Sequence, residues 1–127
     1  MTDEDRAWLR LEFERCAPYI QAALDEDDIG GFELEDVWDW INTDKAQLWP
    51  TPNSAVVTAL ECFPRKKVIR YWLCGGILAE CLESHTRIEN WAKRNGATCA
   101  AISGRKGWLR ALPGYKISPT VLMTKVL

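Results

Sequence analysis

His85 is the only histidine of the chain, so it is the first side chain to consider as a general base. Catalysis by an imidazole needs a solvent-reachable ring beside a hydroxyl, thiol or carboxylate. His85 instead falls at helical spacing with Cys81, Ile88 and Ala92 on an apolar stripe, which favours a packed histidine. The chain also lacks the G-x-S-x-G motif of many serine hydrolases. The sequence therefore predicts no catalytic residue.

Cysteines are the second group that could do chemistry. There are five, an odd number, and no two of them form a C-x-x-C pair: Cys16, Cys62, Cys74, Cys81 and Cys99. A structural zinc site needs Cys or His ligands paired at short spacing. We therefore predict no metal site, and interpret the cysteines as small hydrophobic residues whose free thiols suit a reducing compartment.

A basic patch is the third candidate. Arg65, Lys66 and Lys67 follow one another, and Arg105 and Lys106 lie between Gly104 and Gly107. Glycines around two cations ahead of a helix can bind a phosphate, and the G-x-x-G spacing occurs in KH RNA-binding domains. A strand-to-helix turn that needs glycine is the simpler interpretation. Nucleic acid is possible but not favoured, because the isoelectric point is about 5.4.

Tryptophan is abundant, with seven residues in a chain of 127. Trp38 and Trp72 lie on apolar stripes and can pack inside. Trp8 and Trp40 fall off the stripes of their helices and, together with Trp49, are candidates for a protein interface. Exposed tryptophan is costly unless a partner covers it, and tryptophan is a preferred anchor of such interfaces.

Charge is divided unevenly along the chain. Residues 1–50 hold 14 acidic and 4 basic side chains, whereas residues 51–127 hold 4 acidic and 12 basic ones. The densest acidic run is Asp25-Glu26-Asp27-Asp28, a second candidate for protein contact. Two interpretations stay open: either the acidic segment folds across the basic part and neutralises it, or the two surfaces meet other chains.

Size and composition indicate one globular domain, residues 1–127. With 47% hydrophobic and 27% charged residues, a chain of this length can bury a real core. No apolar run approaches the roughly 20 residues of a spanning helix, and the acidic start does not resemble a secretion signal. We therefore expect an intracellular protein that does not enter a membrane.

The first 45 residues should form an acidic helical part. Leu9, Phe13, Cys16, Ile20 and Leu24 recur at helical spacing. Pro18 removes a backbone donor, which predicts a kink or two short helices that meet near residues 16–17. A loop should follow from residue 25, and a second helix should cover residues 34–42.

From residue 46 the apolar pattern changes to that of strands. A short strand over 47–49 and longer ones over 55–63 and 67–74 should pair antiparallel, because Pro64 suits a tight turn between the last two. Gly75 and Gly76 should end the third strand. A long helix whose stripe runs from Leu78 to Ala92 and a strand over 98–102 then form a parallel crossover. A short helix over 108–112 and a last strand over 120–126 complete an α+β fold with a mixed sheet and helices on both faces.

Residues 47–127 resemble the GNAT acetyltransferase superfamily, specifically the short, divergent GNAT-like proteins of tailed bacteriophages. The resemblance rests on these stretches: Gln47-Leu48-Trp49, Val56-Val57-Thr58, Lys67-Val68-Ile69, Gly75-Gly76, Glu89-Asn90-Trp91-Ala92-Lys93 with Gly96, Gly104-Arg105-Lys106-Gly107-Trp108 with Leu112, and Gly114-Tyr115. It implies a central sheet in which strands 67–74 and 98–102 run parallel and splay apart.

The chain departs from the working members of that superfamily at two places. They bind the pyrophosphate of coenzyme A with the turn [RQ]-x-x-G-x-[GA], whereas residues 73–78 here offer only Gly75-Gly76, followed by Ile77 and Leu78. The family's acid tyrosine is replaced by Arg110, which stays protonated and cannot relay a proton near neutral pH.

These departures favour a non-catalytic GNAT-like protein without a cofactor. We expect it to be a structural or interaction component of a tailed-phage virion or its assembly, present in the virion and in the host cytoplasm during assembly, with other virion proteins and further copies of itself as partners. One alternative is an acetyltransferase that holds acetyl-CoA through residues 75–78. A nucleic-acid-binding module is a second.

Overall fold

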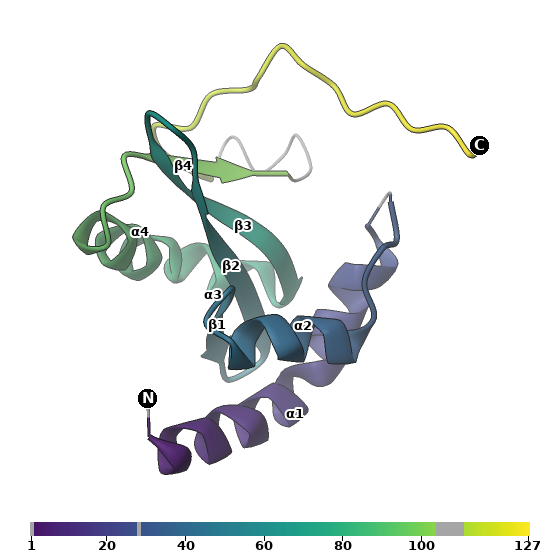
Figure 1. Cartoon of the computed structure of the whole chain (residues 1–127), viewed down its shortest axis with the longest axis vertical. Helices are drawn as coiled ribbons and strands as arrows, with labels where there is room; N and C mark the ends of the chain where they lie inside the picture. The colour runs from purple at the N-terminus through teal and green to yellow at the C-terminus, as the bar shows by residue number, and fades with distance from the viewer. Residues whose placement is uncertain (1, 28, 104–110) are drawn as a thin grey trace.

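The computed structural model describes residues 2–27, 29–103 and 111–127. Its elements are α1 (Asp3–Asp25), α2 (Leu34–Asn42), β1 (Gln47–Thr51), β2 (Ser54–Cys62), β3 (Lys67–Gly76), α3 (Leu78–Glu83), α4 (His85–Arg94) and β4 (Cys99–Ile102). The strands form one mixed sheet in the order β1-β2-β3-β4, antiparallel except for the parallel pair β3 and β4. The predicted α+β class and the parallel crossover are confirmed (Figure 1).

Helix α1 begins at a complete capping box. Thr2 Oγ1 accepts from the amide of Asp5, and the Asp5 carboxylate accepts from the amide of Thr2. The helix continues through Pro18, so the alternative of two short helices is wrong. Pro18 itself is exposed, and the buried stripe on either side of it keeps both halves on the sheet. The ribbon of α1 bends part-way along its length in Figure 1, as a proline inside a helix leads us to expect.

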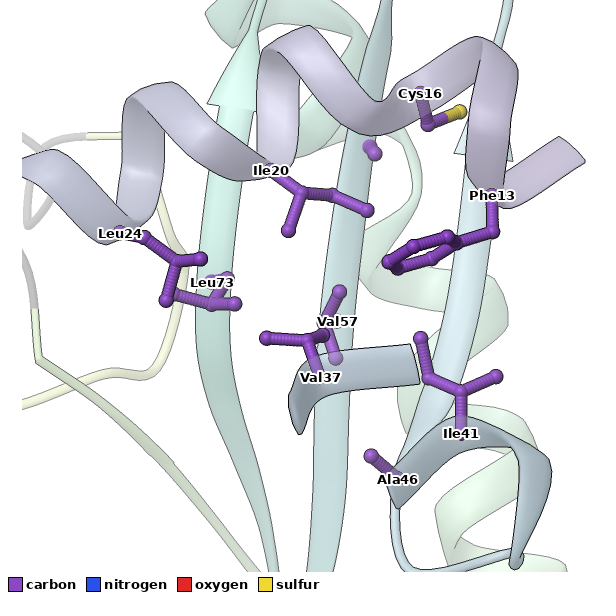
Figure 2. Packing of buried hydrophobic residues seen from close by; sticks show 10 residues of the cluster. Phe13, Cys16, Ile20, Leu24, Val37, Ile41, Ala46, Val57 and Leu73 are labelled. Atoms are coloured by element: carbon purple, nitrogen blue, oxygen red, sulfur yellow. The ribbon is translucent and has the colours of Figure 1, made fainter. Parts of the chain in front are cut away.

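The first core lies between α1, α2 and one face of the sheet. Helix α2 has the predicted bounds and buries Val37 and Ile41. Figure 2 shows Phe13, Ile20 and Leu24 directed from α1 towards these side chains and towards the strands. The full buried set of this core is Phe13, Cys16, Ile20, Leu24, Val37, Ile41, Ala46, Ala55, Val57 and Leu73.

Two hairpins set the register of the antiparallel strands. In the second, Phe63 donates its amide to the carbonyl of Lys66 at 2.8 Å, which closes the turn that Pro64 predicts. The register between β2 and β3 slips at Val57 and Thr58, which face Leu73 and Tyr71, so Trp72 has no residue opposite it. This bulge directs Trp72 to the first core, where it packs on the aromatic residues Phe32 and Trp40.

The helix expected from Leu78 to Ala92 is two helices, α3 and α4, that meet at Ser84. Ser84 is buried, and its Oγ donates to the Glu80 carbonyl at 3.0 Å, a back-bonded geometry that disturbs a helix. Leu78 is exposed, so its predicted place on the buried stripe is also wrong. The remaining residues form a second core on the opposite face of the sheet, made of Val56, Ile69, Tyr71, Cys81, Ile88 and Ala92.

The C-terminal segment differs most from expectation. The short helix predicted over 108–112 falls mainly outside the described residues, and Ala111 and Leu112 form a turn. The strand predicted over 120–126 is wrong for the single chain, because these residues have no regular structure and are exposed. A strand needs a neighbouring strand to pair its backbone groups, and in the described residues the segment has none.

Candidate interaction surfaces

The loop from Gly75 to Leu78 is the first predicted site, and the backbones of Tyr19 and Asn53 pack against its two glycines. A Cβ on Gly75 would lie 2.0 Å from the carbonyl oxygen of Tyr19 in α1. Gly76 has φ +100°, and its Cβ would lie 2.4 Å from the carbonyl oxygen of Asn53. Close packing and backbone conformation therefore explain why both residues are glycine, without a ligand.

The amides that follow are partly engaged as well. Ile77 donates its backbone N–H to the carbonyl of Asn53 at 3.2 Å. The Glu80 carboxylate accepts from the backbone N–H of Asn53 at 3.0 Å, which places a negative charge in the first turn of α3. This helix has only six residues. A carboxylate here repels phosphate, so the arrangement opposes binding of a pyrophosphate.

Trp8 is an exposed tryptophan, with 56% of its surface accessible. It shares a helix face with Glu12 and Arg15 and borders an open groove of about 550 Å³ between α1, β1 and α4. The Arg15 guanidinium contacts Glu12 at 2.6 Å and donates to the carbonyl of Thr51 at 2.9 Å. The other residues that line the groove are Trp49, Pro50, Pro52 and Arg87.

Trp49 lies half-buried at the edge of the same groove. Its indole N–H donates to Thr58 Oγ1 at 2.9 Å, and its ring meets Trp91 edge-on at a centroid distance of 5.5 Å. The Arg87 guanidinium lies over the Trp49 ring at 5.6 Å. The structure thus brings together Trp8 and Trp49, two of the three tryptophans predicted for an interface.

Trp40 does not join them. It is half-buried among Phe32 and Trp72, with ring centroids 5.3 and 5.2 Å away. Although Trp40 falls off the stripe of α2, residues 29–33 place Phe32 against its ring and the bulge in β3 turns Trp72 towards it. Aromatic neighbours at these distances stabilise the fold, so Trp40 is a core residue.

Asp25, Glu26 and Asp27 end α1 and begin an exposed loop, as predicted. Asp25 accepts from Gln21 at 2.9 Å, and Asp27 accepts from the amide of Gly30 at 3.3 Å. Asp28, the fourth member of this acidic run, lies outside the described residues. The three described residues are exposed, so a partner can reach them.

The predicted basic patch is only partly described. Arg65 and Lys66 are exposed at the tip of the β2–β3 hairpin beside Phe63. Lys67 is half-buried, and its Nζ donates to the carbonyl of Asn95 at 2.9 Å, where it stabilises the end of α4. Arg105 and Lys106 lie outside the described residues, as does the whole Gly104–Gly107 loop.

The ion pairs between described residues each join two members of the same half of the chain. Arg6–Asp44, Arg10–Glu14, Arg10–Glu35 and Arg15–Glu12 each join two residues of the acidic half. Arg70–Glu61 and His85–Glu89 each join two residues of the basic half. The described ion pairs thus neutralise charge within each half, and both interpretations of the charge division stay open.

The histidine and the five cysteines were the other candidates for chemistry. His85 is half-buried, and its Nδ1 lies 2.5 Å from the carbonyl of Leu82. All five cysteines are free thiols, and Cys62 and Cys99 are exposed. Burial raises the pKa of the Cys74 thiol to about 12. In residues 2–27, 29–103 and 111–127, no cluster of three or more His, Cys, Asp or Glu side chains is placed to hold a metal ion.

The residues that sequence reasoning missed are Glu12, Arg15 and Arg87 around the groove. Glu12 and Arg15 follow Trp8 at helical spacing, so the polar face of α1 carried a signal for them. For Arg87 there was no signal, because α4 approaches β1 only in the folded chain. None of the described helices is long and apolar enough to cross a membrane.

The fold recurs in solved structures of two other proteins. The chain is similar to TTHA1254 from Thermus thermophilus, with a TM-score of 0.62, 18% identity, and 91% of this chain and 92% of that one covered for a single-residue variant. It is also similar to a variant of BH1408 from Bacillus halodurans, with a TM-score of 0.52, 10% identity, and 93% and 90% covered. No family model and no curated protein matches the sequence. At these identities the likeness establishes a shared α+β fold.

Proposed function

We propose that this chain is a non-catalytic protein of the GNAT-like fold that acts through protein contacts. Its setting is a tailed-phage virion or the assembly of one, in the host cytoplasm and then in the particle. We infer the family from the resemblance of residues 47–127 to GNAT-like phage proteins. The parallel pair of strands and the helices on both faces agree with that family, and β3 pairs with β4 only from Val68 to Tyr71, five residues short of its end.

The observation that carries this proposal is the packing around Gly75. The Tyr19 carbonyl of α1 lies where any side chain would project, and the Asn53 carbonyl accepts from the amide of Ile77. A pyrophosphate needs successive free amides and positive surroundings. Here the amide of Ile77 already donates to the carbonyl of Asn53, and the Glu80 carboxylate lies beside the turn. The loop therefore serves the docking of α1 on the sheet.

The groove beside Trp8 supports a role in protein contact. Trp8 is more than half exposed, and prolines, a second tryptophan and two arginines surround the hollow next to it. Tryptophan and arginine are the side chains that most often anchor protein interfaces. Helices α1 and α2 offer a second surface, because together they carry nine acidic side chains and three basic ones.

Calorimetry with acetyl-CoA tests the loss of the cofactor site. We expect no heat of binding at millimolar ligand, with an active acetyltransferase as the positive control. Micromolar binding together with acetylation of any amine would instead establish the acetyltransferase alternative. A gel shift of DNA or RNA that weakens steeply with salt would favour the nucleic-acid alternative through Arg65 and its neighbours.

Mass spectrometry of purified virions tests the assembly role. We expect the chain at a fixed ratio to the major particle proteins. Absence from the particle, together with no stable association with any virion protein during infection, contradicts the proposal. In reconstitution with a purified virion partner, Trp8→Ala should weaken binding about tenfold or more. Leu11→Ala is the matched control, because Leu11 is exposed on the same helix and does not line the groove.

A further inference from the structure

The groove between α1, β1 and α4 carries one unbalanced positive charge. Three of its described lining residues are charged: Glu12, Arg15 and Arg87. Glu12 and Arg15 form an ion pair at 2.6 Å, so their charges cancel. Arg87 is exposed on α4 and belongs to none of the ion pairs between described residues. The groove therefore presents the charge of Arg87 to a partner.

Arg87 is positioned over an aromatic ring. Its guanidinium carbon lies 5.6 Å from the centroid of the Trp49 ring. The Trp49 ring is itself fixed, because its indole N–H donates to Thr58 Oγ1 at 2.9 Å and the Trp91 ring packs against it at 5.5 Å. A cation–π contact acts through the face of the ring and leaves the N–H donors of the arginine able to bind a carboxylate. Arg87 thus offers a directed site for one carboxylate.

The rest of the groove is apolar and held in shape. Trp8, of which 56% is exposed, lines it together with Pro50 and Pro52. Arg15 donates to the carbonyls of Thr51 and Pro52 at 2.9 and 3.1 Å, which ties the β1–β2 turn to α1. A groove that is fixed before binding loses little conformational entropy when a ligand enters. An apolar side chain of a partner can therefore lie against Trp8 and the two prolines.

The acidic side of α1 decides which anion can enter. Glu4 and Glu12 lie four residues before and after Trp8, so these three residues share one side of the helix. A nucleic-acid strand carries a charge at every phosphate and would bring several of them close to this acidic side. A peptide with one carboxylate can place it on Arg87, on the α4 side of the groove, and present only uncharged groups to α1. The charges therefore favour a peptide over nucleic acid.

We propose that the groove binds an extended segment of another protein in which one Asp or Glu side chain is adjacent to apolar residues. The carboxylate pairs with Arg87, and the apolar residues lie against Trp8, Pro50 and Pro52. This inference rests on the proposed function in that the chain acts through protein contacts. It adds the chemistry of the partner segment, which a role in protein contact alone leaves open.

Selection from a displayed library of random heptapeptides tests the chemistry of the partner. On the immobilised chain, we expect enrichment of peptides that have one acidic residue next to apolar ones. Arg87→Gln should lose the acidic preference and keep the apolar one. Arg94→Gln is the matched control, because Arg94 is an exposed arginine of the same helix and does not line the groove. No enrichment, enrichment without an acidic preference, or an acidic preference that Arg87→Gln retains overturns the inference.

A double-mutant cycle with the most enriched peptide locates the carboxylate. The peptide, and a form whose acidic residue is replaced by the matching amide, are titrated against the parent chain and against Arg87→Gln. On the parent chain the amide form should bind about tenfold more weakly. On Arg87→Gln the two forms should differ by less than about twofold, whereas Trp8→Ala should weaken both forms to a similar extent. An equal loss on the parent chain and on Arg87→Gln places the carboxylate elsewhere and contradicts the inference.

Two other occupants of the groove have their own signatures. Single-stranded DNA that displaces the peptide, with an affinity that decreases steeply as salt rises, identifies a nucleic-acid site. Light scattering that gives twice the 14.5 kDa of one chain, and the mass of one chain for Arg87→Gln, identifies a second copy as the occupant. Either result overturns the assignment of the groove to a segment of another protein.

Failure of this inference is distinguishable from failure of the proposed function. If only the inference is wrong, the virion partner binds Arg87→Gln as tightly as the parent chain, and the chain is still found in virions. If only the function is wrong, the selected acidic peptides bind through Arg87 although the chain is missing from virions.

Discussion

The backbone carbonyl of Tyr19 in α1 stands directly against Gly75 in β3, so that a Cβ on Gly75 would come within 2.0 Å of the oxygen. Real atoms do not approach so closely, and a backbone carbonyl cannot rotate away as a side chain does. The distance therefore ties the position of the acidic helix to the end of a central strand.

Gly75→Ala should destabilise the protein by about 2 kcal/mol, because α1 must shift to admit one methyl group. The measurement is urea unfolding followed by tryptophan fluorescence. Gly31→Ala is the matched control, since its Cβ meets nothing within 4 Å. The control should change stability by less than about 0.5 kcal/mol. Equal stability of the two variants contradicts the close packing.

Thr58→Val should lower the free energy of unfolding by about 1–3 kcal/mol, because it leaves two polar groups without their hydrogen-bond partner. The fully buried Thr58 hydroxyl accepts from the indole of Trp49 and donates to the Gln47 side chain, both at 2.9 Å. Thr98→Val, at an exposed site, is the control and should be near neutral. If thermal unfolding gives both variants the same melting temperature, the network does not contribute to stability.

Thiol labelling should divide the cysteines into two groups. Cys62 and Cys99 are exposed and should react within minutes with an alkylating reagent at pH 8. Burial raises the pKa of Cys16, Cys74 and Cys81, which leaves less thiolate and limits access, so these should react roughly 100-fold more slowly. Peptide mass spectrometry after a short labelling time measures the extent of alkylation at each cysteine. Fast labelling of Cys16 in the native protein would contradict its burial.

Stability should fall at alkaline pH. Burial raises the pKa of the Cys74 thiol to about 12, whereas the same thiol in the unfolded chain has a pKa of 9.0. As the pH rises, the unfolded chain therefore loses this proton before the folded chain does. Below pH 9 the Cys74 thiol makes its full contribution to the free energy of unfolding. Above pH 9 this contribution decreases by about 1.4 kcal/mol for each pH unit. Cys74→Val removes the titrating group, so the parent should lose more stability than this variant between pH 8 and 10. Equal slopes contradict the shift.

Much of the fold was predictable because the local patterns agree with the packing. The stripe through Val37 and Ile41 gave α2 its bounds, since no other face of that segment is apolar enough to bury. Pro64 marked the second hairpin, and the β3-to-β4 crossover followed from the length of the helical segment between two apolar runs.

The remaining errors depend on contacts that distant segments make. Ser84 interrupts the expected helix through a hydrogen bond to a carbonyl, which no hydrophobic period reveals. Trp40 is covered by Phe32 and by Trp72, and Trp72 points there only because the β2–β3 register slips. Of the candidate site, Trp8 was identified from its position off the stripe, whereas Arg87 joins the groove only through the packing of α4.

The acidic charge is concentrated on one face of the sheet, because helices α1 and α2 carry nine acidic and three basic side chains, whereas α3 and α4 on the other face carry three of each. This uneven distribution gives the electrostatic field around each molecule a preferred direction. Two molecules that approach each other in solution are thus rotated before they collide, so productive encounters become more frequent. Ions screen such fields beyond about 10 Å at 0.1 M salt, so the speed of association, more than the final affinity, should depend on ionic strength.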